Sequence, residues 1–184
     1  VAEAPRIVFV NEQPAARVLA KYPDAWRTRA RVVPQGFDSR VVPRVARPRG
    51  EGPLRIVYTG RFYDGVRTPQ TLLAALLLLK QQTPLAGRIS VECVGGSMES
   101  YERRSAQLGL ARVVTFSGRH SPDAALAVAA TADLLLVIDA PSVGPNLFLP
   151  SKLIDYLPLG IPILGLTPAE GATAELLRRL GYQT

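Results

Sequence analysis

The sequence contains very few of the residues that build disulfides, metal sites and histidine-dependent active sites. Among its 184 residues, Cys93 is the only cysteine and His120 the only histidine. One cysteine forms no intrachain disulfide, which favours a reducing, cytoplasmic location, and inside an apolar segment Cys93 is expected to be a small buried hydrophobe. One histidine without a visible partner offers neither a histidine-rich metal site nor a catalytic triad. We therefore expect no metal and no cofactor, and the sequence assigns no catalytic residue.

Long apolar segments and nucleotide-binding fingerprints are also missing. The richest apolar run, residues 72–79, ends at Lys80 and is far shorter than the ~20 residues of a membrane-spanning helix. No secretory signal is visible, and the chain begins at Val1 rather than at methionine, as expected of a piece of a longer protein. Neither a Gly-x-Gly-x-x-Gly after a strand nor a P-loop occurs. The hydrophobic fraction of 47% still suffices for the core of one domain.

Positive charge is concentrated at the beginning of the chain. Residues 1–50 hold ten Lys and Arg against four Asp and Glu, a net charge of +6, whereas the remainder carries +1. Nucleic-acid binding would suit this charge, but the arginines are not interleaved with aromatics, so we expect no nucleic-acid partner. An anionic ligand or peripheral binding to the anionic inner face of a membrane fits the charge as well. An arginine-rich solvated surface is the plain alternative.

Short apolar segments alternate with helical ones from residue 54 onward. The expected strands cover residues 55–59, 89–94, 113–116, 133–138 and 161–166. Helices are expected to begin near Thr68 or Asp64, Glu99, Ser121, Pro150 and Ala172. Strict alternation, with a continuous apolar strand at 133–138, predicts an α/β protein with a Rossmann-like parallel sheet and helices on both faces.

The first 53 residues have a different organisation. A strand is expected at residues 6–10, a helix at 15–21 with Asn11 as its cap, and an extended segment at 31–34. Residues 39–53 contain three prolines among arginines and valines, which is typical of a linker. The expected division is therefore an N-terminal segment 1–38, a linker 39–53 and a domain 54–184.

Polar residues follow three of the expected strands. Ligands of such sheets bind at the carboxyl ends of the strands. Gly60-Arg61 follows the first strand, and Arg67 comes six residues later; two guanidiniums near a helix start suit a diphosphate. Gly95-Gly96 follows the second strand and Gly118-Arg119-His120 the third. The plain alternatives are solvated arginines, a tight turn and an exposed loop.

The stretch from residue 148 to 166 combines a short helix with a buried strand. Pro150 suits the first helical turn, and Gly160 suits the left-handed position beyond the helix end. Ser151, Lys152 and Asp155 form a polar stripe on this helix, either an ordinary solvated face or a site for a ribose or phosphate. The preceding connection, residues 139–147, is rich in Pro and Gly, as are loops that hold substrate through backbone amides.

Taken together, these motifs resemble the donor domain of GT-B glycosyltransferases, most closely the large retaining family called group 1. The resemblance rests on residues 58–61 with Arg67, residues 94–96, residues 114–118 and residues 150–163, which occur in the family's order. It covers about residues 54–180. Residues 34–38, Pro-Gln-Gly-Phe-Asp, resemble the family's turn before the interdomain linker, which implies that residues 1–38 end the acceptor-side domain.

The resemblance implies a role for each group of residues. The donor diphosphate would be bound by Gly60, Arg61, Arg67, Ser151 and Lys152. The base and ribose would be bound by Gly95, Gly118, Arg119, His120 and Asp155, with the ribose hydroxyls on the aspartate. The donor-sugar loop would comprise Gly144, Pro145, Asn146 and Leu147.

Two positions depart from the family pattern. The family commonly has two glutamates eight residues apart, and here these positions are Leu147 and Asp155. The acidic sugar contact is therefore absent or supplied elsewhere, which leaves the donor sugar open. The family's second basic residue is usually lysine, and Arg67 stands there; its guanidinium fork still neutralises a diphosphate.

The resemblance implies a glycosyltransferase that moves a sugar from a nucleotide-diphosphate donor to a glycan or lipid-linked acceptor. The sugar nucleotide is then a substrate, and no cofactor is implied. Two alternatives remain open at this point. One is a non-catalytic Rossmann-like binding or interaction domain, and the other is a nucleotide-sugar enzyme such as an epimerase.

Overall fold

A computed structural model describes residues 3–38, 52–96, 98–142 and 144–184. Most of the predicted linker, residues 39–51, lies outside the described residues. The N-terminal unit contains β1 (Ile7–Phe9), α1 (Glu12–Leu19), a 3-10 helix (Asp24–Arg29) and β2 (Ala30–Val32). The larger unit contains β3 (Leu54–Thr59), α2 (Gln70–Gln82), β4 (Ile89–Val94), α3 (Glu99–Gln107), β5 (Val114–Gly118), α4 (Pro122–Ala129), β6 (Leu134–Ile138), α5 (Ser151–Tyr156), β7 (Ile163–Leu166) and α6 (Ala172–Arg179).

The larger unit is built on a five-stranded parallel sheet with strand order β5-β4-β3-β6-β7. The order reverses at β3, so the carboxyl ends of β3, β4 and β6 meet where a ligand crevice is expected. Among the described residues after 54, five strands alternate with five helices. The predicted α/β architecture is therefore confirmed.

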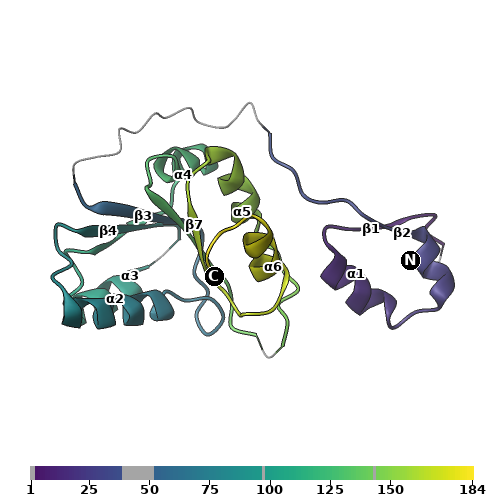
Figure 1. The fold of residues 1–184 in the computed structure, drawn as a ribbon, viewed down its shortest axis with the longest axis horizontal. Helices are drawn as coiled ribbons and strands as arrows, with labels where there is room; N and C mark the ends of the chain where they lie inside the picture. Colours follow the sequence, from purple (N-terminus) through teal and green to yellow (C-terminus); the bar gives the residue numbers. More distant parts are fainter. Residues whose placement is uncertain (1–2, 39–51, 97, 143) are drawn as a thin grey trace.

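Helices cover both faces of this sheet (Figure 1). One face packs against α2 and α3 through a core that includes Tyr58, Leu73 and Leu136. The opposite face packs against α4, α5 and α6 through a core that includes Leu135, Leu153 and Leu177. Residues of β6 alternate between the two cores, which explains why its sequence is apolar at every position.

Local sequence signals account for several element ends. Gly160 adopts the left-handed conformation with φ 64°, as predicted, and Pro150 occupies the N-cap position of α5. Helix α2 begins at Gln70 with Pro69 at its N-cap position, so it starts close to Thr68 and not at the alternative, Asp64. The carboxylate of Asp64 instead accepts a hydrogen bond from Tyr101. Asn11 occupies the N-cap position of α1, but its side chain makes no capping bond. The predicted side-chain cap at Asn11 is therefore wrong.

The N-terminal unit is a small two-stranded parallel sheet, β1-β2, with α1 beside it. Among the residues that the structure describes, two hydrogen bonds join it to the larger unit: Asn11 Nδ2 donates to the Leu147 carbonyl at 3.4 Å, and Gln13 Nε2 donates to Glu175 at 2.6 Å. In the part of the chain that the structure describes, none of the helices has both the length and the hydrophobicity needed to cross a bilayer.

Candidate functional site

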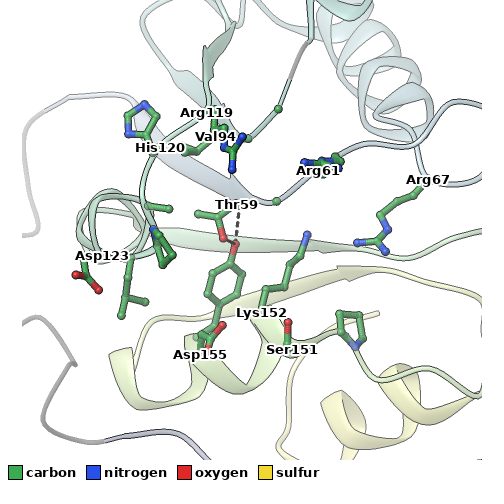
Figure 2. Close-up of a pocket in the computed structure, with 18 of the residues that line it drawn as sticks. Thr59, Arg61, Arg67, Val94, Arg119, His120, Asp123, Ser151, Lys152 and Asp155 are labelled. Carbon is green, nitrogen blue, oxygen red and sulfur yellow. Dashed lines mark hydrogen bonds between the residues drawn. The ribbon is translucent and has the colours of Figure 1, made fainter.

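A cavity of about 580 Å³ opens at the carboxyl ends of β3, β4 and β5 (Figure 2). Its walls are the loop after β3, the turn after β4, the start of α4 and the exposed side of α5. It is lined by Thr59, Gly60, Arg61, Tyr63, Arg67, Val94, Gly95, Gly96, Arg119, His120, Pro122, Asp123, Ala125, Leu126, Pro150, Ser151, Lys152, Asp155 and Tyr156. Segments far apart in the sequence therefore meet at the sheet end that the topology predicts.

The loop after β3 presents two guanidiniums on one tyrosine ring. The backbones of Tyr63 and Arg67 pair with each other through two hydrogen bonds of 2.8 Å. The guanidinium carbons of Arg61 and Arg67 lie 5.9 and 5.5 Å from the centroid of the Tyr63 ring. Cation–π attraction at these distances holds both side chains near one position, so the loop offers the two charges together.

A column of aromatic rings supports this loop from beneath. Tyr58 stacks on Phe62 with centroids 4.7 Å apart, and Phe62 meets the edge of Tyr101 at 5.4 Å. The Tyr101 hydroxyl donates to Asp64, within the loop, and the Tyr58 hydroxyl donates to the Arg61 carbonyl at 3.4 Å. These aromatic residues belong to the core that packs against α2 and α3, and they hold the loop that carries Arg61 and Arg67 in position.

Lys152 contributes a third positive charge from α5. Its Nζ atom is buried without a hydrogen-bond partner and lies 3.9 Å from the centroid of the Tyr58 ring. Burial, reinforced by the charge of Arg67, lowers the pKa of Lys152 to about 7, and the carboxylate of Asp139 partly opposes this shift. Lys152 therefore does not belong to a solvated stripe, whereas Ser151 and Asp155 are exposed.

Gly60 and Gly95 allow Lys152, the loop after β3 and the turn after β4 to approach one another closely. A Cβ at Gly60 would lie 2.3 Å from the Lys152 Nζ atom, and the φ of Gly60 is 133°. A Cβ at Gly95 would lie 2.0 Å from the carbonyl oxygen of Gly60. Glycine is therefore required at both positions for steric reasons, and the floor of the cavity is bare backbone.

The side of α5 that faces β3 is fixed by Tyr156. Its hydroxyl accepts a hydrogen bond from the Thr59 amide at 2.8 Å and shares another with the Thr59 hydroxyl at 2.9 Å, as Figure 2 shows. Burial raises the pKa of Tyr156 to about 12, so this hydroxyl stays protonated. Asp155, one residue earlier, lies at the cavity rim, where partial desolvation raises the pKa of its carboxyl.

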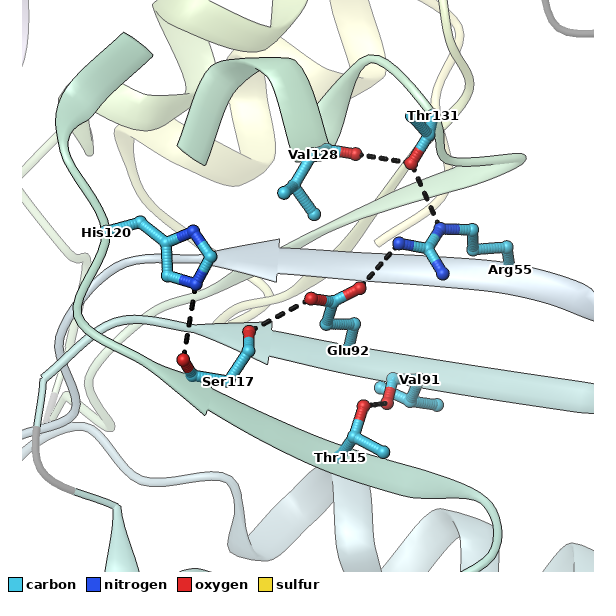
Figure 3. A network of polar contacts seen from close by, with 8 residues as sticks. All are labelled: Arg55, Val91, Glu92, Thr115, Ser117, His120, Val128 and Thr131. Carbon is cyan, nitrogen blue, oxygen red and sulfur yellow. Dashed lines mark hydrogen bonds and ion pairs between the residues drawn. The ribbon is translucent and has the colours of Figure 1, made fainter. Parts of the chain in front are cut away.

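The far end of the cavity contains Arg119 and His120, which follow β5. The His120 ring nitrogen lies 3.2 Å from the Ser117 carbonyl oxygen. The Ser117 hydroxyl donates to Glu92 at 3.0 Å, and Glu92 pairs with Arg55 at 2.5 Å (Figure 3). A polar network across β3, β4 and β5 thus holds the strand end from which these two side chains project.

The cavity is positively charged near its centre. Among the described residues, no carboxylate forms an ion pair with Arg61, Arg67 or Lys152, and the Nε atom of Arg67 is buried without a partner. Figure 2 shows the three side chains pointing toward one region from two elements. Such a set is suited to an anion with several oxygens. In the same described residues, His, Cys, Asp and Glu side chains form no group of three that could hold a metal ion.

Comparisons with known proteins give structural neighbours but no sequence relatives. No protein-family model matches the chain, and no curated protein matches it by sequence. The solved structure of WaaG, a glycosyltransferase involved in lipopolysaccharide biosynthesis, superposes with a TM-score of 0.68 at 18% identity, covering 97% of this chain and 48% of that one. The chain has the fold of one half of a GT-B glycosyltransferase.

Other solved glycosyltransferases superpose in the same way. The lipopolysaccharide outer core galactosyltransferase WaaB gives a TM-score of 0.65 at 18% identity, covering 96% of this chain and 51% of that one. Sucrose-phosphate synthase from Thermosynechococcus elongatus gives 0.64 at 21% identity, covering 89% and 41%. The chain thus spans about half the length, or less, of these neighbours, and the likeness concerns the fold.

The cavity brings together most of the residues predicted for the donor site. Nine of them line it: Gly60, Arg61, Arg67, Gly95, Arg119, His120, Ser151, Lys152 and Asp155. Gly118 lies beside it, where its carbonyl accepts a hydrogen bond from the Gly95 amide. The predicted donor-sugar loop, residues 144–147, does not line this cavity.

The loop of residues 144–147 is instead attached to α6. The backbone of Asn146 bonds on both sides of Gly171, to Glu170 and Ala172, and a Cβ at Gly171 would lie 2.4 Å from the Asn146 carbonyl oxygen. The Leu147 carbonyl accepts the hydrogen bond from Asn11 of the N-terminal unit. The loop therefore lies between α6 and α1.

Several residues of the site were not predicted from the sequence. The rings of Tyr58 and Tyr63 contact the cationic side chains. Tyr156 connects α5 to β3 through its hydrogen bonds to Thr59, and Asp123 lines the end of the cavity near His120. Tyr63 stands between the two predicted arginines, which was a usable signal. The other two tyrosines look like core residues in sequence, and only the packing reveals their roles.

Proposed function

We propose that this chain is the donor-binding half of a glycosyltransferase and that its cavity binds a nucleotide-diphosphate sugar, for transfer to a glycan or lipid-linked acceptor. The observation that carries the proposal is the convergence of Arg61, Arg67 and Lys152, without carboxylate partners, at the carboxyl end of a parallel sheet. Supporting it, the fold is shared with glycosyltransferases, two of which are named for galactosyl and O-GlcNAc transfer. The sequence motifs point to the retaining group 1 family and to its C-terminal domain.

The arrangement suggests how such a donor would lie. Its diphosphate would occupy the space between the three cations, over the bare backbone of Gly60 and Gly95. Its ribose would reach the exposed carboxylate of Asp155, and its base would lie toward Arg119 and His120. In this orientation each chemical part of the donor meets a group of matching polarity.

The same cations would assist the transfer step. As the bond between sugar and diphosphate breaks, negative charge develops on the departing nucleoside diphosphate. Fixed guanidiniums stabilise this developing charge more than the ground state, which lowers the barrier. Lys152 is about half protonated near neutral pH, and an anion beside its Nζ atom favours the charged form. Binding would therefore complete the charge of the site.

Isothermal titration calorimetry with UDP, GDP and ADP tests the proposal on the intact chain. At least one nucleotide should bind, and Arg61→Ala and Arg67→Ala should each weaken it about tenfold or more, since hydrogen bonds to charged groups contribute about 1.5–3 kcal/mol. Arg88→Ala is the matched control, because Arg88 bonds Thr83 just before β4 begins, at the opposite end of that strand from the cavity. If no nucleotide binds, or if all three variants behave alike, the chain is not a donor-binding domain.

The N-terminal unit has a small excess of basic residues, with six Lys and Arg against four Asp and Glu in residues 1–38. Tyr22 and Trp26 stack at 4.5 Å, and the Arg29 guanidinium lies 5.4 Å from the Trp26 ring centroid. Aromatic rings beside basic side chains are typical of surfaces that lie at a membrane interface. We propose that this unit docks peripherally on an anionic cytoplasmic membrane, which would bring the site to a lipid-linked acceptor.

A further inference from the structure

Asp139 is the only buried carboxylate residue among those that the structure describes, with 8% of its surface exposed. It follows β6 directly, at the same sheet end as the cation cavity. Its carboxylate accepts one hydrogen bond, from the Thr167 hydroxyl at 3.0 Å. A carboxylate has acceptor sites for about four hydrogen bonds, and burying a charged one is unfavourable unless it is well partnered. Asp139 therefore has acceptor capacity that the protein leaves unused.

The carboxylate of Asp139 faces a second cavity of about 470 Å³. Besides Asp139, its lining includes five hydroxyl-bearing residues and the apolar residues Ile138 and Leu166; the former are Thr68, Thr71, Ser142, Thr167 and Thr184. Hydroxyls and a carboxylate together with apolar residues suit a ligand with hydroxyl groups and exposed C–H faces. None of the described residues that line this cavity is basic.

The two cavities are lined by consecutive residues of the segment that precedes α2. Arg67 lines the first cavity and Thr68, the next residue, lines the second. The charge of Asp139 also acts on Lys152, whose pKa it raises against the effect of burial. A diphosphate held by Arg67 and Lys152 would therefore place its attached sugar toward Asp139, with the nucleoside at the opposite end of the first cavity.

We propose that this second cavity is the sugar subsite of the donor and that Asp139 binds hydroxyl groups of the sugar. The inference rests on the proposed function, and it locates the acidic contact that is missing at Leu147. Sugar hydroxyls are donors that match the free acceptor sites of Asp139. A buried carboxylate also repels a second carboxylate, so the subsite selects neutral sugars over uronic acids.

The experiment compares donors with and without the sugar. Affinities of the intact chain are measured at pH 6, where Lys152 is largely protonated, for UDP, UDP-glucose and UDP-glucuronic acid, and for GDP with GDP-mannose and ADP with ADP-glucose. The readout is the affinity ratio of each nucleotide sugar to its own nucleoside diphosphate. This ratio cancels any effect of the variants on Lys152 and the diphosphate.

We expect the ratio to fall about tenfold in Asp139→Asn, the loss expected from weakened hydrogen bonds to a charged acceptor. Thr68→Val should lower the ratio by a smaller factor and guards against misfolding of the first variant. Glu170→Gln, which removes an exposed carboxylate near the start of α6, should leave it unchanged. In the wild type, UDP-glucuronic acid should bind more weakly than UDP-glucose.

The possible failures are distinguishable. If no nucleoside diphosphate binds the wild type, the proposed function itself fails. If nucleotides bind but the ratio is the same in wild type, Asp139→Asn and Thr68→Val, the donor site stands and the sugar subsite is overturned. Equal losses for nucleotide and nucleotide sugar would also overturn it, because Asp139 would then act only through the diphosphate site.

Discussion

The ammonium nitrogen of Lys152 lies 3.9 Å from the centroid of the buried Tyr58 ring. The ammonium group of Lys152 therefore contacts the face of an aromatic ring and not a carboxylate. The ring attracts the charge, but it does not replace the hydrogen bonds that the ammonium loses on burial. Lys152 is therefore unfavourably placed in the empty site and favourably placed once an anion is bound, and this difference governs the first prediction.

Nucleotide affinity should rise as the pH falls from 8.5 to 6. Lys152 has a pKa of about 7 in the free protein, so acidification charges it before the ligand arrives. The Lys152→Met variant should bind about tenfold more weakly at pH 6 and show a flatter pH profile. Calorimetric titrations at four pH values measure how nucleotide affinity changes with pH in the wild type and in Lys152→Met, with Arg88→Ala as control. If the two pH profiles are parallel, Lys152 is not the group whose protonation strengthens binding.

The stability of the free protein should show the opposite pH trend. The folded pKa of Lys152 is lowered from 10.5 to about 7, so between these values the unfolded chain binds more protons. Stability therefore rises with pH from about 7 toward 10, by at most about 1.4 kcal/mol per pH unit, and its penalty is fully present below pH 7. Chemical denaturation at pH 7 and 9 should show this rise in the wild type and a smaller one in Lys152→Met.

Neighbouring glycines after β4 should respond very differently to alanine. In Gly95→Ala the new Cβ would lie 2.0 Å from a backbone oxygen of Gly60, whereas in Gly96→Ala it would lie 3.6 Å from the side chain of Arg61. Gly95→Ala should lower the free energy of unfolding by about 1–3 kcal/mol, as overpacking does, and should also weaken nucleotide binding. Gly96→Ala should have little effect on thermal unfolding, and similar losses in both variants would contradict the geometry.

Tyr101→Phe should weaken nucleotide binding although Tyr101 does not line the cavity. The change removes the hydrogen bond to Asp64 but keeps the ring that packs on Phe62, so the arginine-bearing loop loses one attachment. A net hydrogen bond contributes about 0.5–1.5 kcal/mol, which corresponds to a two- to tenfold loss of affinity. Tyr182→Phe, beyond the end of α6, serves as the control. Tyr101→Phe should also lower the melting temperature, by about 2–4 °C.

Membrane binding should depend on the N-terminal unit. The chain should sediment with vesicles containing phosphatidylglycerol but not with phosphatidylcholine vesicles, and added salt should release it, because surface charge attraction is screened. Trp26→Ala combined with Arg29→Ala should reduce the bound fraction several-fold, because this pair forms the proposed interfacial surface. Arg178→Ala, on α6, is the matched control. Equal sedimentation with both lipids would count against the proposal.

The architecture of this chain follows closely from its sequence, because alternating strands and helices leave few topologies open. Residues 133–138 were predicted to be a strand buried on both faces, and β6 indeed contributes to two separate cores. Gly160 was predicted to be left-handed, since the turn from helix to strand requires that conformation. These predictions depend on local pattern and handedness, which neighbouring residues determine.

The chemistry of the cavity was less predictable, because it depends on which side chains meet across elements. Lys152 stood beside Ser151 and Asp155 in one polar stripe, and only the packing of α5 on β3 shows that its nitrogen is buried. Asp139 was noticed only as the first residue of a long connection. Its carboxylate accepts a hydrogen bond from Thr167, which is 28 residues away. No pattern in the sequence predicts that these two residues meet.

The hydrogen bond between Asn11 and Leu147 has a mechanical consequence. Leu147 belongs to a loop that is also tied to the start of α6 through Asn146, and the loop therefore has one anchor on each unit. If the N-terminal unit rotates away, this bond and the one between Gln13 and Glu175 must break, while the loop stays with α6. Within the described part of the chain, such a rotation is thus resisted at two points, and the carbonyl of Leu147 is the one nearer in the sequence to Asp139.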